Sequence, residues 1–331
     1  MSDALLAGYD AVLFDLDGTV YHGTQVIPGA PEAVKAVREH GTAVRFVTNN
    51  ASKAPGDVVT HLRELGLPAE PAEVHTSAQA AAAVLGERLP AGARVLVVGT
   101  ESLAAEVSAA GLTPVRENGP DVAAVVQGHS PDNAWADLAE ACLAIRAGAL
   151  WVACNVDATL PSERGLLPGN GSMVAALRTA TDTEPVVAGK PQPLLFETAA
   201  RSAGASRPLV VGDRLDTDIA GAVAAGVDSL AVLTGVATPA GLLTAIAAER
   251  PTHLAADLTA LTRRADDLKI GPRPGWDVTT GDELVAGGRG GDAPALDLLR
   301  ALCHAAWETG VTTVRADGDA AAAALAELGL A

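Results

Sequence analysis

The most constraining feature of the sequence is the stretch at residues 9–21, YDAVLFDLDGTVY. Its apolar run at 11–14 has the composition of a buried strand, and two aspartates, Asp15 and Asp17, follow directly. Alternate residues of an extended chain point to the same side, so both carboxylates are aimed at one place. Holding two negative charges so close together raises the free energy of the folded state unless a cation lies near them. The stretch therefore predicts a site for a hard metal ion at the end of the first strand.

In three later stretches of the sequence, polar residues also follow an apolar run. The runs are at 43–47, 185–188 and 209–211, and helical patterns at 28–40 and 55–65 alternate with them. This alternation predicts an α/β protein with a parallel sheet, and we expect the run at 185–188 to return to that first sheet. Carboxyl ends of parallel strands meet at one edge, where α/β proteins bind ligands. The residues expected there are Asp15, Asp17, Gly18, Thr48, Asn49, Asn50, Lys190, Asp213 and Asp218.

The length of 331 residues suits two or three domains. Residues 78–184 have their own alternation of helical and strand-like windows and no second copy of the aspartate motif, so we interpret them as an insertion. Beyond residue 266 a proline- and glycine-rich connector leads to a short strand and helix pattern. We expect a core formed by 1–77 and 185–266, an inserted α/β domain at 78–184, and a small α+β C-terminal lobe at 267–331 that packs on the main body.

The charge balance limits the partners. The formal net charge is −17, with 40 acidic and 23 basic residues, which argues against nucleic acid and against an anionic membrane surface. No apolar run approaches the roughly 20 residues of a membrane helix. Cys142, Cys154 and Cys303 form no CxxC pair, and the first ten residues lack the pattern of a signal peptide. We therefore expect a cytoplasmic protein, and the sequence leaves monomer and homodimer open.

The expected cluster of side chains fits phosphoryl transfer. Asp15 can attack phosphorus and form an aspartyl-phosphate, and Asp17 can protonate the leaving oxygen and then activate water. Asp15, the backbone carbonyl of Asp17, and Asp213 offer the oxygen ligands that Mg²⁺ prefers. Asp218 is expected to orient a neighbouring group. Lys190 is expected to neutralise the phosphoryl oxygens, while Thr48 and the backbone near Gly18, Asn49 and Asn50 orient them.

The motifs DLDGT, TNN, GKP and GDRLDTD resemble the four signature motifs of the haloacid dehalogenase superfamily of phosphatases. The insertion lies where type II caps of that superfamily lie. The run at 155–177, followed by GKPQP, resembles the NagD and phosphoglycolate phosphatase branch with its type IIA cap. Within it, the C-terminal extension makes the chain similar to bacterial glycerol 3-phosphate phosphatases. The resemblance implies a Rossmann-like core and Mg²⁺-dependent hydrolysis of a small phosphate monoester.

Glycerol 3-phosphate is the substrate that this resemblance favours, and 2-phosphoglycolate, a nucleoside monophosphate and a sugar phosphate are the alternatives. On the cap, Asn155, Asp157 and Arg164 are candidates for binding the substrate or closing the cap. An equally good interpretation of Arg164 is a solvated loop pair with Glu163. Trp135 and Trp151 lie in a helix and a strand pattern of the cap, and we expect both to pack in a core.

Two functions from other classes remain as alternatives. Receiver domains also phosphorylate an aspartate on a parallel sheet, but they lack the Asp-x-Asp spacing and a large lid. The order of elements in the C-terminal lobe resembles the acetyl-CoA-binding half of the GNAT acetyltransferase fold. Its glycine cluster at 287–295, GGRGGDAPA, departs from the acetyl-CoA loop pattern of that family, so we favour a structural or dimer-forming role for the lobe.

Overall fold

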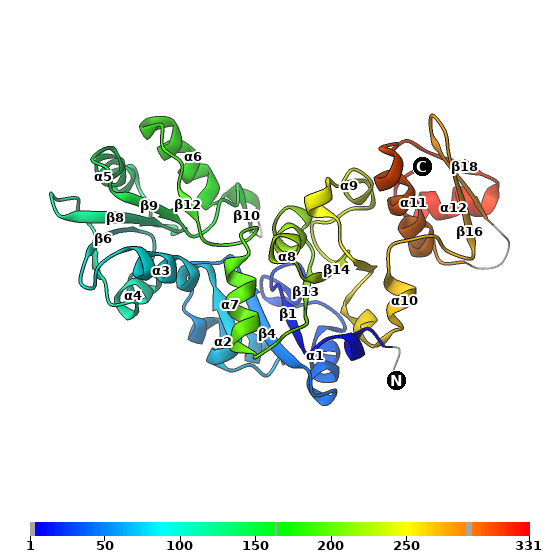
Figure 1. Cartoon of the computed structure of the whole chain (residues 1–331), viewed down its shortest axis with the longest axis horizontal. Helices are drawn as coiled ribbons and strands as arrows, with labels where there is room; N and C mark the ends of the chain where they lie inside the picture. Colours follow the sequence, from blue (N-terminus) through cyan, green and yellow to red (C-terminus); the bar gives the residue numbers. More distant parts are fainter. Residues whose placement is uncertain (1–3, 163, 289–292) are drawn as a thin grey trace. The chain divides into compact units, whose positions relative to one another are not determined.

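The computed structural model describes residues 4–162, 164–288 and 293–331, which form two compact units. The first unit joins Met1–Val44 to Ala203–Ala331, and the second is Arg45–Ser202. Both units alternate helices with strands that are mostly parallel, so the expected α/β class is confirmed (Figure 1). No helix in the described ranges is both long enough and apolar enough to cross a membrane.

A parallel sheet in the first unit carries the first aspartate motif and the last one. Four of its strands lie side by side in the order β15–β14–β13–β1. All residues of β1 are buried, as its uninterrupted apolar run predicts. Strand β4 begins in the same unit, where Ala43 donates its N–H to the carbonyl of Asp10 just before β1. The bounds are β1 Ala11–Phe14, β4 Ala43–Thr48, β13 Pro208–Gly212, β14 Asp228–Val232 and β15 His253–Ala255.

Helices and short turns connect these strands. In α1, Ala33, Val34 and Val37 are buried at the helical spacing that the sequence predicts. A two-stranded antiparallel hairpin, β2–β3, follows the first aspartate motif, and a short helical segment, η3, follows Asp213 and contains Asp218. The bounds are η1 Leu5–Gly8, β2 Tyr21–His22, β3 Gln25–Val26, α1 Ala30–Glu39, η3 Leu215–Ile219, α8 Ala220–Ala225, α9 Pro239–Leu243, η4 Ala247–Glu249, η5 Leu258–Thr262 and α10 Ala265–Leu268.

The second unit contains most of β4, which pairs in parallel with β5, and a five-stranded sheet in the order β12–β9–β8–β6–β7. Helices α5 and α6 pack on this sheet around a core that includes Leu96, Val125 and Val174. A hairpin, β10–β11, projects from the region before α6 (Figure 1). The bounds are α2 Pro55–Glu64, η2 Pro71–Glu73, β5 Val74–Thr76, α3 Ser77–Arg88, β6 Arg94–Val98, α4 Glu101–Ala109, β7 Thr113–Val115, β8 Val122–Gln127, α5 Trp135–Arg146, β9 Leu150–Ala153, β10 Thr159–Ser162, β11 Gly165–Pro168, α6 Asn170–Thr181, β12 Val186–Val187 and α7 Leu194–Ser202.

The strand that leads to Lys190 does not return to the first sheet, so that expectation is wrong. Val186 and Val187 of β12 pair in parallel with Val152 and Ala153 of β9, at the edge of the five-stranded sheet. Two valines in a row can extend any sheet, because β-propensity carries no information about the neighbouring strand. Lys190 therefore follows a strand of the sheet in the second unit.

The two tryptophans of the inserted segment differ in burial. Trp151 of β9 is 2% exposed and donates its indole N–H to Gln127 Oε1 at 3.2 Å. Trp135, at the start of α5, is 82% exposed, so the expectation of core packing is wrong for this residue. A helical pattern predicts the helix, but it does not by itself tell which face of the first turn the tryptophan occupies.

The C-terminal lobe consists of a three-stranded sheet, β16–β17–β18, with helices α11 and α12 (Figure 1). It shares one core with the preceding residues, as expected: Leu298 and Leu302 of α11 belong to the same buried cluster as Leu242 and Leu254. Residues 289–292 of the glycine cluster lie outside the described ranges. The bounds are β16 Trp276–Thr280, β17 Leu284–Gly288, α11 Ala295–Thr309, β18 Val314–Asp317 and α12 Asp319–Glu327.

A buried arginine joins this lobe to the first sheet. Arg300 of α11 is 2% exposed, and its Nε and Nη2 donate to the backbone carbonyl of Leu254 in β15 at 3.1 and 2.5 Å. Its Nη1 donates to Asp297 Oδ1 at 2.6 Å. Burial lowers the pKa of Arg300, and the Asp297 carboxylate opposes that shift. The guanidinium thus satisfies a carbonyl of the edge strand that would otherwise be buried without a donor.

We predict that Arg300→Met lowers the free energy of unfolding by about 3 kcal/mol, because the carbonyl of Leu254 and the carboxylate of Asp297 both lose their donor. Denaturant unfolding followed by circular dichroism measures the change. The matched control in the same lobe is Arg315→Met, whose pair with Glu283 at 3.4 Å is exposed and is worth at most about 1 kcal/mol. Equal losses for the two variants would contradict a structural role for Arg300.

Candidate active site

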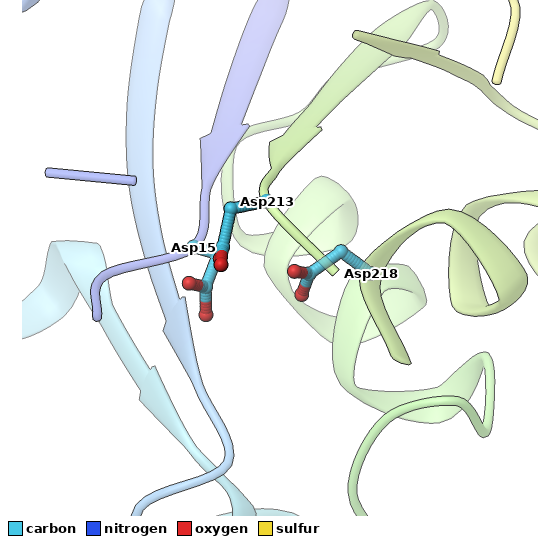
Figure 2. Close-up of side chains that lie close together, drawn as sticks. All are labelled: Asp15, Asp213 and Asp218. Carbon is cyan, nitrogen blue, oxygen red and sulfur yellow. The ribbon is translucent and has the colours of Figure 1, made fainter. Parts of the chain in front are cut away.

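Three aspartates meet at the carboxyl ends of the strands in the first unit. Asp15 follows β1, Asp213 follows β13, and Asp218 lies in η3, and one carboxylate oxygen from each lies within 4.8 Å of the others (Figure 2). Asp15 is 7% exposed, and Asp213 and Asp218 are fully buried. Three carboxylates so close together in a buried place repel one another unless a cation is bound. The oxygen donors suit a hard divalent cation such as Mg²⁺.

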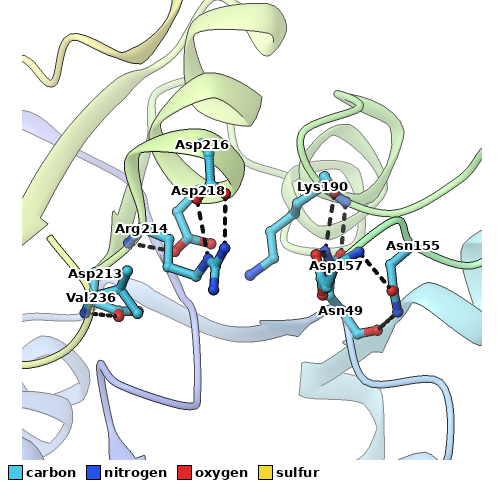
Figure 3. Close-up of polar contacts among 9 residues, drawn as sticks. All are labelled: Asn49, Asn155, Asp157, Lys190, Asp213, Arg214, Asp216, Asp218 and Val236. Carbon is cyan, nitrogen blue, oxygen red and sulfur yellow. Dashed lines mark hydrogen bonds and ion pairs between the residues drawn. The ribbon is translucent and has the colours of Figure 1, made fainter. Parts of the chain in front are cut away.

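Backbone donors hold two of the three carboxylates. Val236 donates its N–H to Asp213 Oδ2 at 2.7 Å (Figure 3). The Thr19 hydroxyl donates to Asp213 Oδ1 at 3.3 Å. Arg214 donates its N–H to Asp218 Oδ2 at 3.1 Å. These bonds fix the orientation of each carboxylate. The two groups are therefore held in a set geometry.

Glycines make room for the buried carboxylates. A Cβ at Gly18 or at Gly235 would overlap the carboxylate of Asp213, and a Cβ at Gly212 would overlap the side chain of Asp218. Gly18 also has φ +94°, a conformation that residues with a side chain rarely adopt. The glycine of the DLDGT motif is thus required both by its backbone conformation and by the close approach of Asp213.

Asp17 is placed differently from the other three aspartates. Its side chain is 53% exposed, and its Oδ1 lies 4.0 Å from Nδ1 of His22 in β2. His22 also bonds through Nε2 to the backbone carbonyl of Thr234 at 2.8 Å. The carboxylate of Asp17 therefore lies at the surface of this unit, where a substrate can reach it. The expectation that Asp17 binds metal through its backbone carbonyl and keeps its carboxylate for proton transfer stays a prediction.

The second unit brings together the asparagine and lysine motifs. Asn49 donates its side-chain amide to the backbone carbonyl of Lys190 at 3.1 Å, and its Oδ1 accepts the N–H of Lys190 at 2.8 Å (Figure 3). Lys190 is 2% exposed, and its Nζ lies 3.4 Å from the carbonyl of Val47. Asn50 donates its N–H to the hydroxyl of Thr48 at 3.1 Å. The TNN and GKP motifs therefore form one hydrogen-bonded group.

Two of the three cap candidates join this group. Asp157 accepts from the Asn49 amide at 3.1 Å, and Asn155, 5% exposed, donates its amide to the carbonyl of Asn49 at 2.7 Å (Figure 3). Arg164 is exposed between strands β10 and β11. The pairing of Arg164 with Glu163 stays untested, because residue 163 lies outside the described ranges.

Cys154 lies in the sequence between the end of β9 and Asn155, and its burial sets the reactivity of its thiol. The thiol is fully buried, and this burial raises its pKa to about 12. A thiol with such a pKa stays protonated at neutral pH and is a poor nucleophile. Cys154 is therefore a packing residue.

Sequence reasoning missed two parts of this arrangement. The hydroxyl of Ser77 donates to the carbonyl of Asn49 at 2.6 Å, beside the bond from Asn155. The loop at 234–237, with the sequence TGVA, contacts Asp213 and Gly18. A signal for the loop was present, since it follows β14 in the same way as the other motifs follow their strands. The loop has no charged residue, so a rule that looks for charged side chains after strands does not find it.

Buried acidic side chains at the carboxyl ends of parallel strands define an α/β enzyme that binds a cation. Family models agree with this class: a haloacid dehalogenase-like hydrolase model matches residues 12–113, and a HAD-hydrolase-like model matches 187–261. A third model, of a GCN5-related N-acetyltransferase like domain, matches residues 273–330.

Individual relatives identify the chain more closely. It is 52% identical over 309 residues to a D-glycerol 3-phosphate phosphatase of Mycobacterium tuberculosis, covering 91% of this chain and 86% of that protein. It is 38% identical to a 5′-nucleotidase of Bacillus subtilis, covering 76% of this chain and 96% of that protein. The crystal structure of the Mycobacterium tuberculosis glycerol phosphate phosphatase in complex with magnesium matches with a TM-score of 0.95 and 49% identity, covering 99% of both chains.

A p-nitrophenyl phosphatase of Archaeoglobus fulgidus matches with a TM-score of 0.71 and 30% identity, covering 77% of this chain and 98% of that one. The chain therefore belongs to the haloacid dehalogenase-like hydrolases and is a phosphatase of that family. The resemblance inferred from the four motifs is confirmed. The roles assigned to individual site residues stay predictions.

We predict that Gly212→Ala lowers kcat by about 100-fold, because the added methyl displaces Asp218, and a shift of about 1 Å in a catalytic arrangement has an effect of that size. Hydrolysis of p-nitrophenyl phosphate measures the change, and a thermal melt checks that the variant is folded. Gly271→Ala is the matched control, since its Cβ would meet no atom within 4 Å. A Gly212→Ala variant with the turnover of the control would show that the position of Asp218 is unimportant.

Proposed function

We propose that this phosphatase hydrolyses glycerol 3-phosphate with Mg²⁺ through an aspartyl-phosphate intermediate. The observation that carries the proposal is the buried cluster of Asp15, Asp213 and Asp218, whose oxygens lie within 4.8 Å of one another. The substrate rests on the relative with 52% identity, whose name specifies D-glycerol 3-phosphate. A nucleoside monophosphate and a sugar phosphate are the alternatives, because other relatives are a 5′-nucleotidase and acid sugar phosphatases.

The covalent step belongs to Asp15. Its carboxylate oxygen forms a bond to phosphorus while the bond from phosphorus to the glycerol oxygen breaks, which divides one difficult displacement into two easier ones. Asp17 gives its proton to the departing oxygen. Asp17 then takes a proton from the water that attacks the aspartyl-phosphate, which releases inorganic phosphate and restores Asp15.

Asp15, the backbone carbonyl of Asp17, and Asp213 would hold Mg²⁺, and Asp218 would orient a neighbouring group. When bound, the ion supplies positive charge that neutralises the phosphoryl oxygens. Lys190 would contribute a second positive charge to these oxygens. The remaining orientation is assigned to Gly18, Thr48, Asn49 and Asn50, and substrate recognition to Asn155, Asp157 and Arg164.

The proposal extends to the organisation of the chain and its setting. We keep the core at 1–77 and 185–266, the cap at 78–184 and the C-terminal lobe at 267–331 as proposed domains. The net charge of −17 and the three free cysteines support a cytoplasmic enzyme for a small metabolite, without a nucleic-acid partner. Monomer and homodimer remain open.

We predict that kcat/KM is higher for glycerol 3-phosphate than for 2-phosphoglycolate, nucleoside 5′-monophosphates and sugar phosphates, as measured by phosphate release with Mg²⁺. Chelation by EDTA removes the activity, and Asp15→Asn abolishes it, because an amide is not a nucleophile for phosphorus. Asp267→Asn, an exposed aspartate in α10, is the control and keeps the wild-type rate. Activity in folded Asp15→Asn would refute the mechanism, and a better substrate in the panel would refute only the choice of glycerol 3-phosphate.

We further predict that Asp17→Asn slows glycerol 3-phosphate hydrolysis much more than formation of the aspartyl-phosphate from p-nitrophenyl phosphate. An alkoxide needs a proton in order to leave, whereas p-nitrophenolate is stable without one. Rapid-quench measurement of the first turnover compares the two substrates in the variant and the wild type. An equal loss on both substrates would remove Asp17 from the role of general acid.

A further inference from the structure

The loop at 234–237, which follows β14, has no role in the proposed mechanism, yet it contacts several parts of the candidate metal site. Its residues are Thr234, Gly235, Val236 and Ala237. We propose that this loop is a positioning segment for the metal site, and that Thr234 is its main positioning residue. The proposal rests on the proposed function, which assigns the backbone carbonyl of Asp17 and the carboxylate of Asp213 to Mg²⁺.

The loop forms hydrogen bonds to both the side chain and the backbone of Asp213. The N–H of Val236 donates to Asp213 Oδ2 at 2.7 Å, and the N–H of Ala237 donates to the backbone carbonyl of Asp213 at 2.7 Å. A Cβ at Gly235 would overlap the same carboxylate. The loop therefore sets both the position and the rotation of this fully buried carboxylate.

The loop also bonds to the backbone of Gly18, the residue after Asp17. The hydroxyl of Thr234 donates to the carbonyl of Gly18 at 2.7 Å, while the N–H of Gly18 donates to the carbonyl of Tyr21 at 2.8 Å. The N–H of Gly18 and the carbonyl of Asp17 belong to one planar trans peptide and point in opposite directions. The bond to Tyr21 therefore sets the direction of the Asp17 carbonyl, the proposed metal ligand. The bond from Thr234 holds the next peptide, between Gly18 and Thr19, and the Thr19 hydroxyl donates to Asp213 Oδ1 at 3.3 Å.

A third contact joins the loop to the hairpin β2–β3. The carbonyl of Thr234 lies 2.8 Å from Nε2 of His22. A carbonyl only accepts, so Nε2 carries the hydrogen and Nδ1 is the ring nitrogen that faces Asp17 Oδ1 at 4.0 Å. Thr234 thus bonds to Gly18 through its hydroxyl and to His22 through its carbonyl, and these two residues flank Asp17 in space.

Thr234 differs from an ordinary loop threonine in the number of segments that it connects. One residue links the first aspartate motif, the hairpin after it and, through the next two residues, Asp213. Partners that orient metal ligands change metal affinity by about 10- to 100-fold when they are removed. Loss of the Thr234 hydroxyl removes a donor from the Gly18 carbonyl and loosens the backbone that joins the Asp17 carbonyl to Thr19, whose hydroxyl holds Asp213, so we expect metal affinity to fall.

The test compares Thr234→Val with Thr234→Ser in the full chain. Valine keeps the shape and removes the hydroxyl, whereas serine keeps the hydroxyl. Calorimetric titration of the metal-free protein with Mg²⁺, and with Mn²⁺ as a second probe, measures affinity without turnover. We expect Thr234→Val to bind each metal about 10-fold or more weakly and Thr234→Ser to bind within about 3-fold of wild type.

Two further variants complete the comparison. Thr244→Val is the matched control, because the Thr244 hydroxyl donates to carbonyls of Ala240 and Gly241 in α9, at the surface of the same unit. Its metal affinity stays at the wild-type value. Gly235→Ala keeps the Thr234 hydroxyl but displaces Asp213, and we expect it to weaken metal binding as well.

The outcomes separate this inference from the proposed function. Wild-type protein that neither binds Mg²⁺ nor needs it would refute the proposed function itself. Wild-type protein that binds Mg²⁺, with Thr234→Val binding equally well, would overturn the inference alone. A Thr234→Val variant whose metal-free form melts at a lower temperature but binds metal normally would give Thr234 a structural role only, which also overturns it.

Discussion

The repulsion among Asp15, Asp213 and Asp218 is the constraint on which the rest of the first unit depends. Their oxygens lie within 4.8 Å of one another, and all three side chains are buried, so each charge raises the free energy of the others. Backbone N–H groups of Arg214 and Val236 offset part of this energy. The folded chain therefore holds the three charges in place for a cation that neutralises them, and the glycines beside them allow the close approach.

The C-terminal lobe packs against the segment that carries Asp218. Ile219 follows Asp218 directly, and it is buried in the same cluster as Leu298 and Leu302 of α11. Arg300 of that helix also bonds to the edge strand β15. A lobe that shares a core with the acidic segment η3 adds packing to that segment. The structural role favoured for the lobe from the sequence stays a prediction.

Much of the candidate site could be predicted because its signals are local. A strand that is buried on both faces is an uninterrupted apolar run, and the polar residue after it lies at the carboxyl edge. This rule located Asp15, Asp213 and Asp218, which the structure brings together. The same rule was wrong about the strand before Lys190, because nothing local tells two valines which sheet they extend.

The sequence by itself determined the fold class, the family and the identity of the acidic residues, since four motifs in a set order and spacing depend only on the chain. Tertiary structure decided that β12 joins the second sheet, that Trp135 is exposed, and that the loop at 234–237 holds Asp213 and Gly18. Each of these depends on residues far apart in the chain. The loop acts through two backbone N–H groups, which every residue except proline has, and through one threonine hydroxyl, so no charged residue marks it in the sequence.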